Sequence, residues 1–213
     1  VRRLGHALIE EIELDIGGSR IDKQYGDWMN IWHELARKGD HDRGYSYLIG
    51  DVPELTRLDG AKNTRDRTIK DAYTLLIPLQ FSFNRHTGLA LPLIALQYHE
   101  VRFNIEFRRL NELCIYTGHF ATGLKNIQMD EAALLVEYIF LDAEERRRFA
   151  QIGHEYLIEQ VQISEEAVHN MSAKLRLNFN HPTKCLMWVF RNGDFTNGSR
   201  FLSYSHCDTQ SPT

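Results

Sequence analysis

The chain has 213 residues, of which 43% are hydrophobic and 11% aromatic, and a formal net charge of −4. A chain of this length and composition can bury a substantial core, which excludes an intrinsically disordered protein. The slightly acidic balance excludes a general positive field that recruits nucleic acid, so no direct nucleic-acid partner is expected. No apolar run reaches the roughly 18 residues of a transmembrane helix, so no membrane span is expected either.

The N-terminal part predicts a strand, a helix and a long loop. Apolar and acidic side chains alternate within residues 8–16, which predicts a half-buried strand that ends at Gly17-Gly18. Apolar residues then recur at spacings of three and four, which predicts an amphipathic helix over 21–37. Residues 38–72 contain several glycines and a balanced set of charges, so they are predicted to form a solvated surface loop.

The middle of the chain has the strongest strand patterns. Residues 73–83 alternate with period two and place five apolar side chains on one face. The nearly continuous apolar run 89–97 is typical of a strand that is buried on both faces. Residues 101–108 alternate between apolar and polar side chains, which predicts a strand with one charged face.

The C-terminal part predicts a short helix between strands. Asp142 with Glu145 has the spacing of a capping box, and Arg146, Arg147 and Arg148 follow near the end of the same helix, where positive charge is favourable. This explains the arginines better than a phosphate-binding clamp does. Further strands are predicted over 133–141, 155–163, 173–180 and 184–191. Eight strands and two helices without βαβ alternation indicate an all-β jelly-roll sandwich with short helices.

The pattern of reactive residues predicts neither an enzyme nor a metal site. Ten histidines and three cysteines occur without H-x-H, H-E-x-x-H or C-x-x-C spacing, so the cysteines are expected to be reduced and mostly buried. Glu100 and Glu106 would lie about 20 Å apart on one strand, too far for a glycosidase pair, and Glu11 and Glu13 are expected on a solvent face. We therefore expect no catalytic, cofactor-binding or metal-binding residues and no cofactor.

One alternative from another functional class stays open. Jelly rolls also host lectins and glycosidases, and two carboxylates from different strands could converge in a cleft. The alternative is therefore a carbohydrate-binding or glycoside-hydrolysing jelly-roll protein. An aromatic platform or an acidic groove would distinguish it.

Several segments resemble the major capsid protein of nucleocytoplasmic large DNA viruses, of the phycodnavirus and iridovirus types. The stretch LDAEERRRFAQIGHEYLIEQ at 141–160 is similar to a junction in that family. The other similar segments, which follow the family's order along the chain, are ELDIGG at 13–18, WMNIWHEL at 28–35, PLQFSF at 78–83, GLALPLIALQYHEV at 88–101, LNFNHPTK at 177–184 and WVF at 188–190.

The resemblance implies a part of a double jelly-roll protein of roughly twice this length. It implies a first jelly roll over 1–141 that lacks its N-terminal strands, an inter-barrel helix and linker over 142–154, and the start of a second, incomplete jelly roll over 155–213. It also implies a structural role as a homotrimeric capsomer subunit of an icosahedral capsid. The implied partners are the protein itself, neighbouring capsomers and minor capsid proteins, in a virion assembled in the host cytoplasm.

Overall fold

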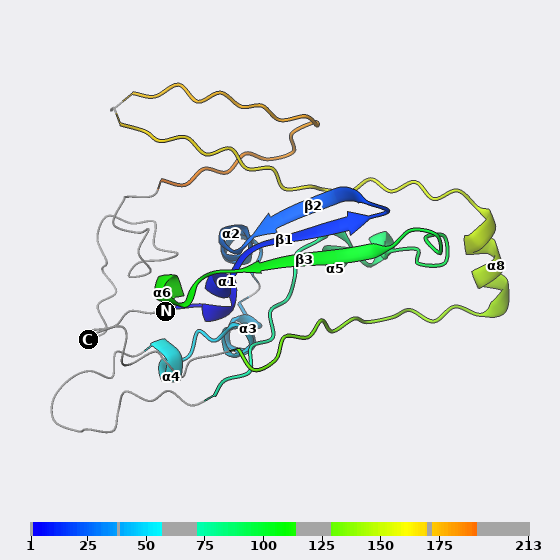
Figure 1. Cartoon of the computed structure of the whole chain (residues 1–213), viewed down its shortest axis with the longest axis horizontal. Coiled ribbons are helices and arrows are strands. Elements are labelled where there is room, and N and C mark those ends of the chain that lie inside the picture. The colour runs from blue at the N-terminus through cyan, green and yellow to red at the C-terminus, as the bar shows by residue number, and fades with distance from the viewer. Residues whose placement is uncertain (1, 38, 57–71, 114–128, 170–171, 191–213) are drawn as a thin grey trace.

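The computed structural model describes residues 2–37, 39–56, 72–113, 129–169 and 172–190. At its centre lies a three-stranded antiparallel sheet in the order β2-β1-β3 (Figure 1). Its strands are β1 (Ile9–Ile16), β2 (Ser19–Tyr25) and β3 (Val101–Phe107). The described helices are α1 (Leu4–Leu8), α2 (Gly26–Ala36), α3 (Asp42–Ile49), α4 (Pro53–Thr56), α5 (Ser82–Arg85), the 3₁₀ helix η1 (Thr87–Leu89), α6 (Leu110–Leu113) and α8 (Ala143–Gln151).

Strands β1 and β2 form a tight hairpin. Its two turn residues, Gly17 and Gly18, have φ of 60° and 80°, which is the conformation that a two-residue hairpin turn favours. The predicted first strand is thereby confirmed. The predicted helix is wrong at its start, because the chain stays extended to Tyr25 and α2 begins only at Gly26.

The start of the helix was mispredicted because β2 turns polar side chains towards the core. Asp22 pairs with Leu14 and Gln24 pairs with Ile12, and paired residues of antiparallel strands share a face. Asp22 and Gln24 are accordingly buried. The register with β1 skips Ile21, which packs half-buried against the same core, so the spacing of four from Ile21 to Tyr25 imitates one helical turn without being one.

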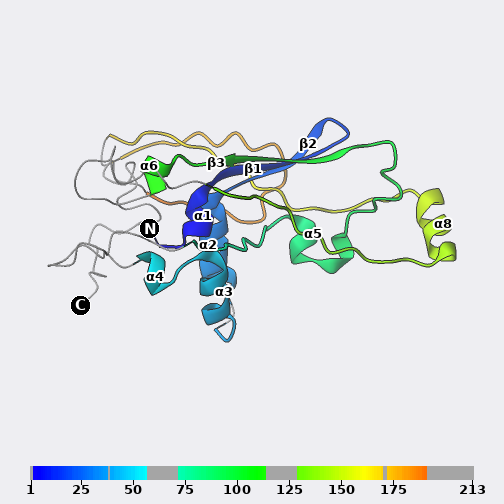
Figure 2. The ribbon, with the colours of Figure 1, turned by 60° about the horizontal axis from the view of Figure 1, so that its bottom comes forward.

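The core lies between the sheet and the elements beneath it. Figure 2 shows α1, α2, α3 and α5 on the same side of the sheet. The buried centre consists of Ile9, Ile12, Leu14, Met29 and Phe81, and the half-buried side chains packed against it are Ile16, Ile21, Ile77, Leu79, Phe83, Val101 and Phe103.

Residues 73–83 pack as predicted but do not join the sheet. Ile77, Leu79 and Phe81 all contact the core, so the predicted apolar face is confirmed. The segment is nevertheless not a strand, and α5 begins at Ser82. The segment is connected to β2 through a side chain and not through strand pairing. The side-chain amide of Gln24 donates a hydrogen bond to the backbone carbonyl oxygen of Gln80 at 2.8 Å.

Two predictions in the first half of the chain need correction. The predicted loop 38–72 contains the helices α3 and α4, and its residues 57–71 lie outside the described part. The apolar run 89–97 forms turns, with the Ala95 amide bonded to the Pro92 carbonyl at 2.8 Å, and Leu93 is 44% exposed. Pro92 cannot donate to a ladder, which argues against a central strand there. The predicted strand at 101–108 is confirmed as β3.

The predicted strands at 133–141, 155–163, 173–180 and 184–191 are not strands over the residues that the structure describes, which end at 190. Alternation reports only a tendency, and a ladder also needs a neighbouring backbone with free donors and acceptors. No described segment supplies one here, so large apolar side chains stay exposed, with Phe140 at 91%, Leu157 at 94% and Trp188 at 77%. The predicted all-β class is therefore confirmed only in part, as an antiparallel sheet accompanied by helices.

The predicted helix after Asp142 is confirmed. The Asp142 carboxylate accepts a hydrogen bond from the Glu145 amide at 2.8 Å, and Arg148 lies in the last turn of α8. None of the residues of α8 is buried, so local chemistry dominates its stability. In the described segments, no helix combines the length and the hydropathy that crossing a membrane requires.

Asp142→Ala should weaken α8 by about 1 kcal/mol, because an N-cap side chain that satisfies a free amide contributes about that much. Hydrogen exchange of the amides in 143–151 should accelerate about fivefold. Asp142→Asn is the matched control, since asparagine caps as well as aspartate. Equal exchange in the alanine variant and the wild type would contradict the role of the cap.

Candidate functional site

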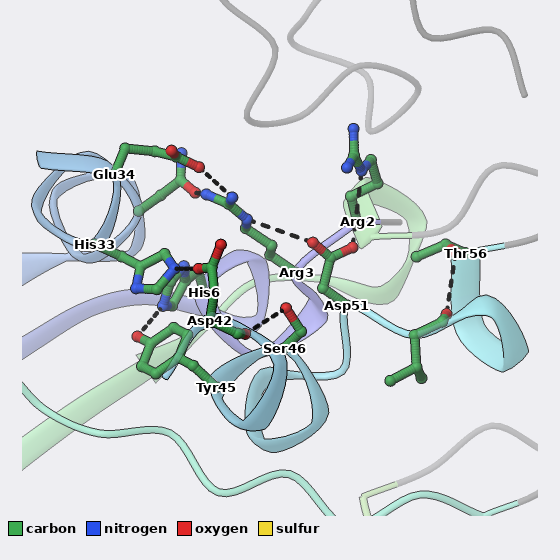
Figure 3. Close-up of polar contacts among 12 residues, drawn as sticks. Arg2, Arg3, His6, His33, Glu34, Asp42, Tyr45, Ser46, Asp51 and Thr56 are labelled. Atoms are coloured by element: carbon green, nitrogen blue, oxygen red, sulfur yellow. Dashed lines mark hydrogen bonds and ion pairs between the residues drawn. The ribbon is translucent and has the colours of Figure 1, made fainter. Parts of the chain in front are cut away.

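The densest group of polar contacts lies where α1, α2 and α3 meet (Figure 3). We call this group the corner cluster and define it as Arg3, His6, Asn30, His33, Glu34, Asp42, Tyr45 and Asp51. It joins residues that are up to 48 positions apart in the chain. Because the three helices are short, these contacts contribute much of their mutual orientation.

Arg3 is the centre of the charged half of the corner cluster. Its guanidinium donates to Asn30 Oδ1 at 2.5 Å and to the Glu34 carboxylate, and its Nε lies 3.5 Å from Asp51 Oδ2. Arg3 is also the one described non-glycine residue with a positive φ, 52°. Such a backbone conformation costs of order 1–3 kcal/mol, and the three side-chain partners offset that cost.

Two histidines and a tyrosine form the aromatic half. The rings of His33 and Tyr45 are stacked at a centroid distance of 4.0 Å, and Tyr45 Oη lies 2.7 Å from His6 Nε2. His6 is fully buried. Burial, helped by the positive charges of Arg3 and His33, lowers the pKa of His6 to about 4. Burial also lowers the pKa of His33 and raises that of Tyr45 to about 12.

These pKa shifts make the corner cluster a poor proton-transfer site near neutral pH. A general acid or base works best with a pKa near the working pH, and both His6 and Tyr45 have moved away from it. No three His, Cys, Asp or Glu side chains in the described part of the chain are placed to hold a metal ion. The geometry instead suits a structural junction that holds the helices beside the sheet.

A second group of residues lines a pocket of about 380 Å³ beside α5. Its lining is Ser82, Arg85, His86, Gly88, Leu89, Leu157 and Glu159. Arg85 lies 4.9 Å from the centroid of the Trp32 ring and donates to Glu159 Oε2 at 3.1 Å. The carboxylate that lines the pocket is therefore already paired, which does not suit the two carboxylates of a glycosidase.

The residues weighed in the sequence do not come together as a site. Glu100 forms an ion pair with Arg102 on the surface, at 2.5 Å. Glu11 and Glu13 both pair with Lys23, at 2.6 and 3.3 Å, as expected for a solvent-facing strand. Cys185 is a free thiol but is exposed, contrary to the expectation of burial, while Cys114 and Cys207 lie outside the described residues.

Sequence reasoning missed the corner cluster. His6, His33 and Tyr45 are separated by 27 and 12 positions, and no spacing rule relates residues that far apart. The one available signal is that His6 lies within the apolar run LGHAL, where a buried histidine must find a partner.

Comparison with known proteins gives matches along nearly the whole chain. The family model described as "Major capsid protein N-terminus" matches residues 1–142, and the one described as "Large eukaryotic DNA virus major capsid protein" matches residues 145–213. Capsid protein 1 of Acanthamoeba polyphaga mimivirus is 51% identical over 96% of this chain and 35% of its own length. The major capsid protein of Pyramimonas orientalis virus is 47% identical over 87% of this chain and 43% of its own length.

A solved structure is similar as well. The quasi-atomic model of the PBCV-1 virus capsid matches with a TM-score of 0.56 and 34% identity over 86% of this chain and 43% of that one. The chain thus spans between about a third and less than half of the length of these relatives.

Proposed function

The chain belongs to the major capsid protein family of large eukaryotic DNA viruses, and from this premise we propose that it is part of a building block of an icosahedral virus shell. The family is one of structural proteins and not of enzymes. The function is therefore mechanical, and the place of action is the capsid of the virion, assembled in the host cytoplasm.

The observation that carries this proposal is the succession of the two family models along one chain. They cover residues 1–142 and 145–213, almost without a gap and in the order expected of one continuous subunit. The similarity to the PBCV-1 capsid supports the same proposal from the coordinates.

The proposed architecture is a double jelly roll. Residues 1–141 belong to the first jelly roll, 142–154 form the helix and linker between the two, and 155–213 begin the second. The exposed position of α8 and its lack of buried residues support a connecting role. The alternating segments after α8 support strands that find their ladder partners elsewhere in the whole protein.

The proposed partners are further copies of the same protein. Three copies form a capsomer, which contacts neighbouring capsomers and minor capsid proteins. The net charge of −4 does not favour direct contact with nucleic acid. The exposed apolar side chains after residue 129 agree with a surface that is covered in the assembled state.

Light scattering coupled to size exclusion, applied to the whole protein, tests the assembly. We expect a mass of three subunits over the full range of accessible concentrations, because capsomer contacts are large and permanent. A monomer that persists at high concentration would contradict the proposal. Electron microscopy of the same sample should show particles with threefold symmetry.

A further inference from the structure

Residues 141–154 contact one another at both ends of α8. Figures 1 and 2 both place this helix away from the central sheet, with an extended segment before it and another after it. α8 has nine residues, and a helix of that length is marginal by itself. The contacts at its two ends are therefore important for its stability.

Two side chains close the start of α8. The Asp142 carboxylate accepts from the Glu145 amide, and the guanidinium of Arg146 donates to the Leu141 carbonyl oxygen at 3.2 Å. Leu141 precedes the capping residue, so this second bond connects the incoming segment to the first turn. The backbone of Asp142 is extended, with ψ of 177°, and the chain changes from extended to helical directly after it.

A side chain from beyond the helix closes its end. His154 Nε2 lies 2.8 Å from the Phe149 carbonyl oxygen. The carbonyl can only accept, so the ring donates, and both the protonated imidazole and one neutral tautomer carry the required hydrogen. The last four carbonyl groups of a helix lack partners within it, and that of Phe149 is one of them. His154 therefore supplies a partner that the helix itself cannot.

The same histidine also packs against the helix. The centroids of the Phe149 and His154 rings are 5.0 Å apart. Both side chains are half-buried, whereas the four residues between them are exposed. Apolar contacts across a helix end often accompany the capping of its last carbonyl groups. The bond and the ring contact together hold the outgoing segment against the last turn.

We infer that residues 141–154 form a self-capped connector, in which Arg146 and His154 are positioning residues that fix the directions of the segments before and after α8. Neither bond involves a residue outside this stretch, so the connector keeps its shape whichever partners the flanking segments have in the whole protein. That these segments belong to two jelly rolls rests on the proposed function. The closure of the two ends does not.

Hydrogen exchange in the whole protein tests the closure by His154. His154→Ala removes the bond and the ring contact, so exchange in peptides within 146–154 should accelerate about fivefold, as expected for one lost hydrogen bond. His154→Gln keeps a side-chain donor and should exchange nearly as slowly as the wild type. Gly153→Ala is the matched control, since a Cβ there meets nothing within 4 Å, and it should not accelerate exchange.

Arg146→Ala tests the other end. Exchange in the first turn should accelerate although alanine is the better helix former, and Arg146→Lys, which keeps a cationic donor, should restore part of the protection. Because a helix this short opens as one unit, each alanine variant should accelerate exchange at both ends of α8.

Three results would overturn the connector. They are unchanged exchange in both alanine variants, acceleration confined to the mutated end, and an equal acceleration in β1 and β3, which would indicate a general loss of stability. None of these readouts depends on trimer formation, which the light-scattering experiment measures separately. A failure of the proposed shell therefore remains distinguishable from a failure of the connector.

Discussion

Replacing Gly26 with alanine should cost at least about 3 kcal/mol of the free energy of unfolding. A Cβ atom at this position would lie 2.1 Å from the carbonyl oxygen of His6 and 2.3 Å from that of Ile9. Both obstacles are backbone atoms and cannot move aside as a flexible side chain can. Relieving the overlap requires α2 to move away from α1 and the start of β1, which opens the packing around Met29.

Chemical denaturation of the whole protein measures this effect as a lower midpoint with an unchanged slope. Gly44→Ala in α3 is the matched control, since a Cβ there meets nothing within 4 Å. Alanine favours a helix over glycine by about 1 kcal/mol, so that variant should be neutral or slightly more stable. A Gly26→Ala protein with the midpoint of the wild type would show that α2 does not pack as closely as the structure has it.

The elements that could be predicted are those whose signals are local and complete. The Gly17-Gly18 turn, the alternation in β1 and β3, and the Asp142 cap each follow from neighbours in the sequence. In β2 the same alternation exists, but Asp22 and Gln24 occupy the buried face. A rule that places every apolar residue on the buried face therefore fails for β2. It groups Ile21 with Tyr25, four positions apart, and this spacing predicts a helix.

The remainder could not be predicted because it depends on partners far away in the sequence. Residues 155–163 have the pattern of a strand, yet a pattern does not supply the neighbouring backbone that a ladder requires. The corner cluster combines His6, His33 and Tyr45, whose association depends on how three helices pack. The family could still be recognised from the sequence. Similar segments indicate common ancestry even where individual strands and helices are assigned incorrectly.

Acidification should destabilise the fold through His6. This imidazole is fully buried, and its pKa falls from 6.5 to about 4 on folding. At a pH between these two pKa values, His6 is protonated in the unfolded chain and neutral in the folded chain. The free energy of unfolding therefore falls as the pH falls. The stabilisation is complete above pH 6.5, and the loss reaches about 3 kcal/mol at pH 4, at 1.36 kcal/mol per pKa unit.

The surroundings of His6 explain why its pKa is low in the folded chain. Burial is the main reason that the pKa of His6 is low; Arg3, which caps α1, and His33 on α2 lower it further, while a hydrogen bond with Asn30 and the charge of Glu34 act in the opposite direction. On α3, Tyr45 contacts the ring, and Asp42 lies beside His33. Protonation would therefore place a second positive charge beside Arg3 at the point where the helices meet, and α3 should separate first.

His6→Gln removes the titration but keeps a neutral group that can bond to the Tyr45 hydroxyl. Its stability should change about 3 kcal/mol less than that of the wild type between pH 7 and pH 4, as measured by urea denaturation at each pH. His181→Gln, at an exposed histidine, should follow the wild type. The His6→Gln variant lacks the only imidazole that this prediction invokes. If it kept the full pH dependence of the wild type, the acid sensitivity would have to arise from other groups, and the role given to His6 would be wrong.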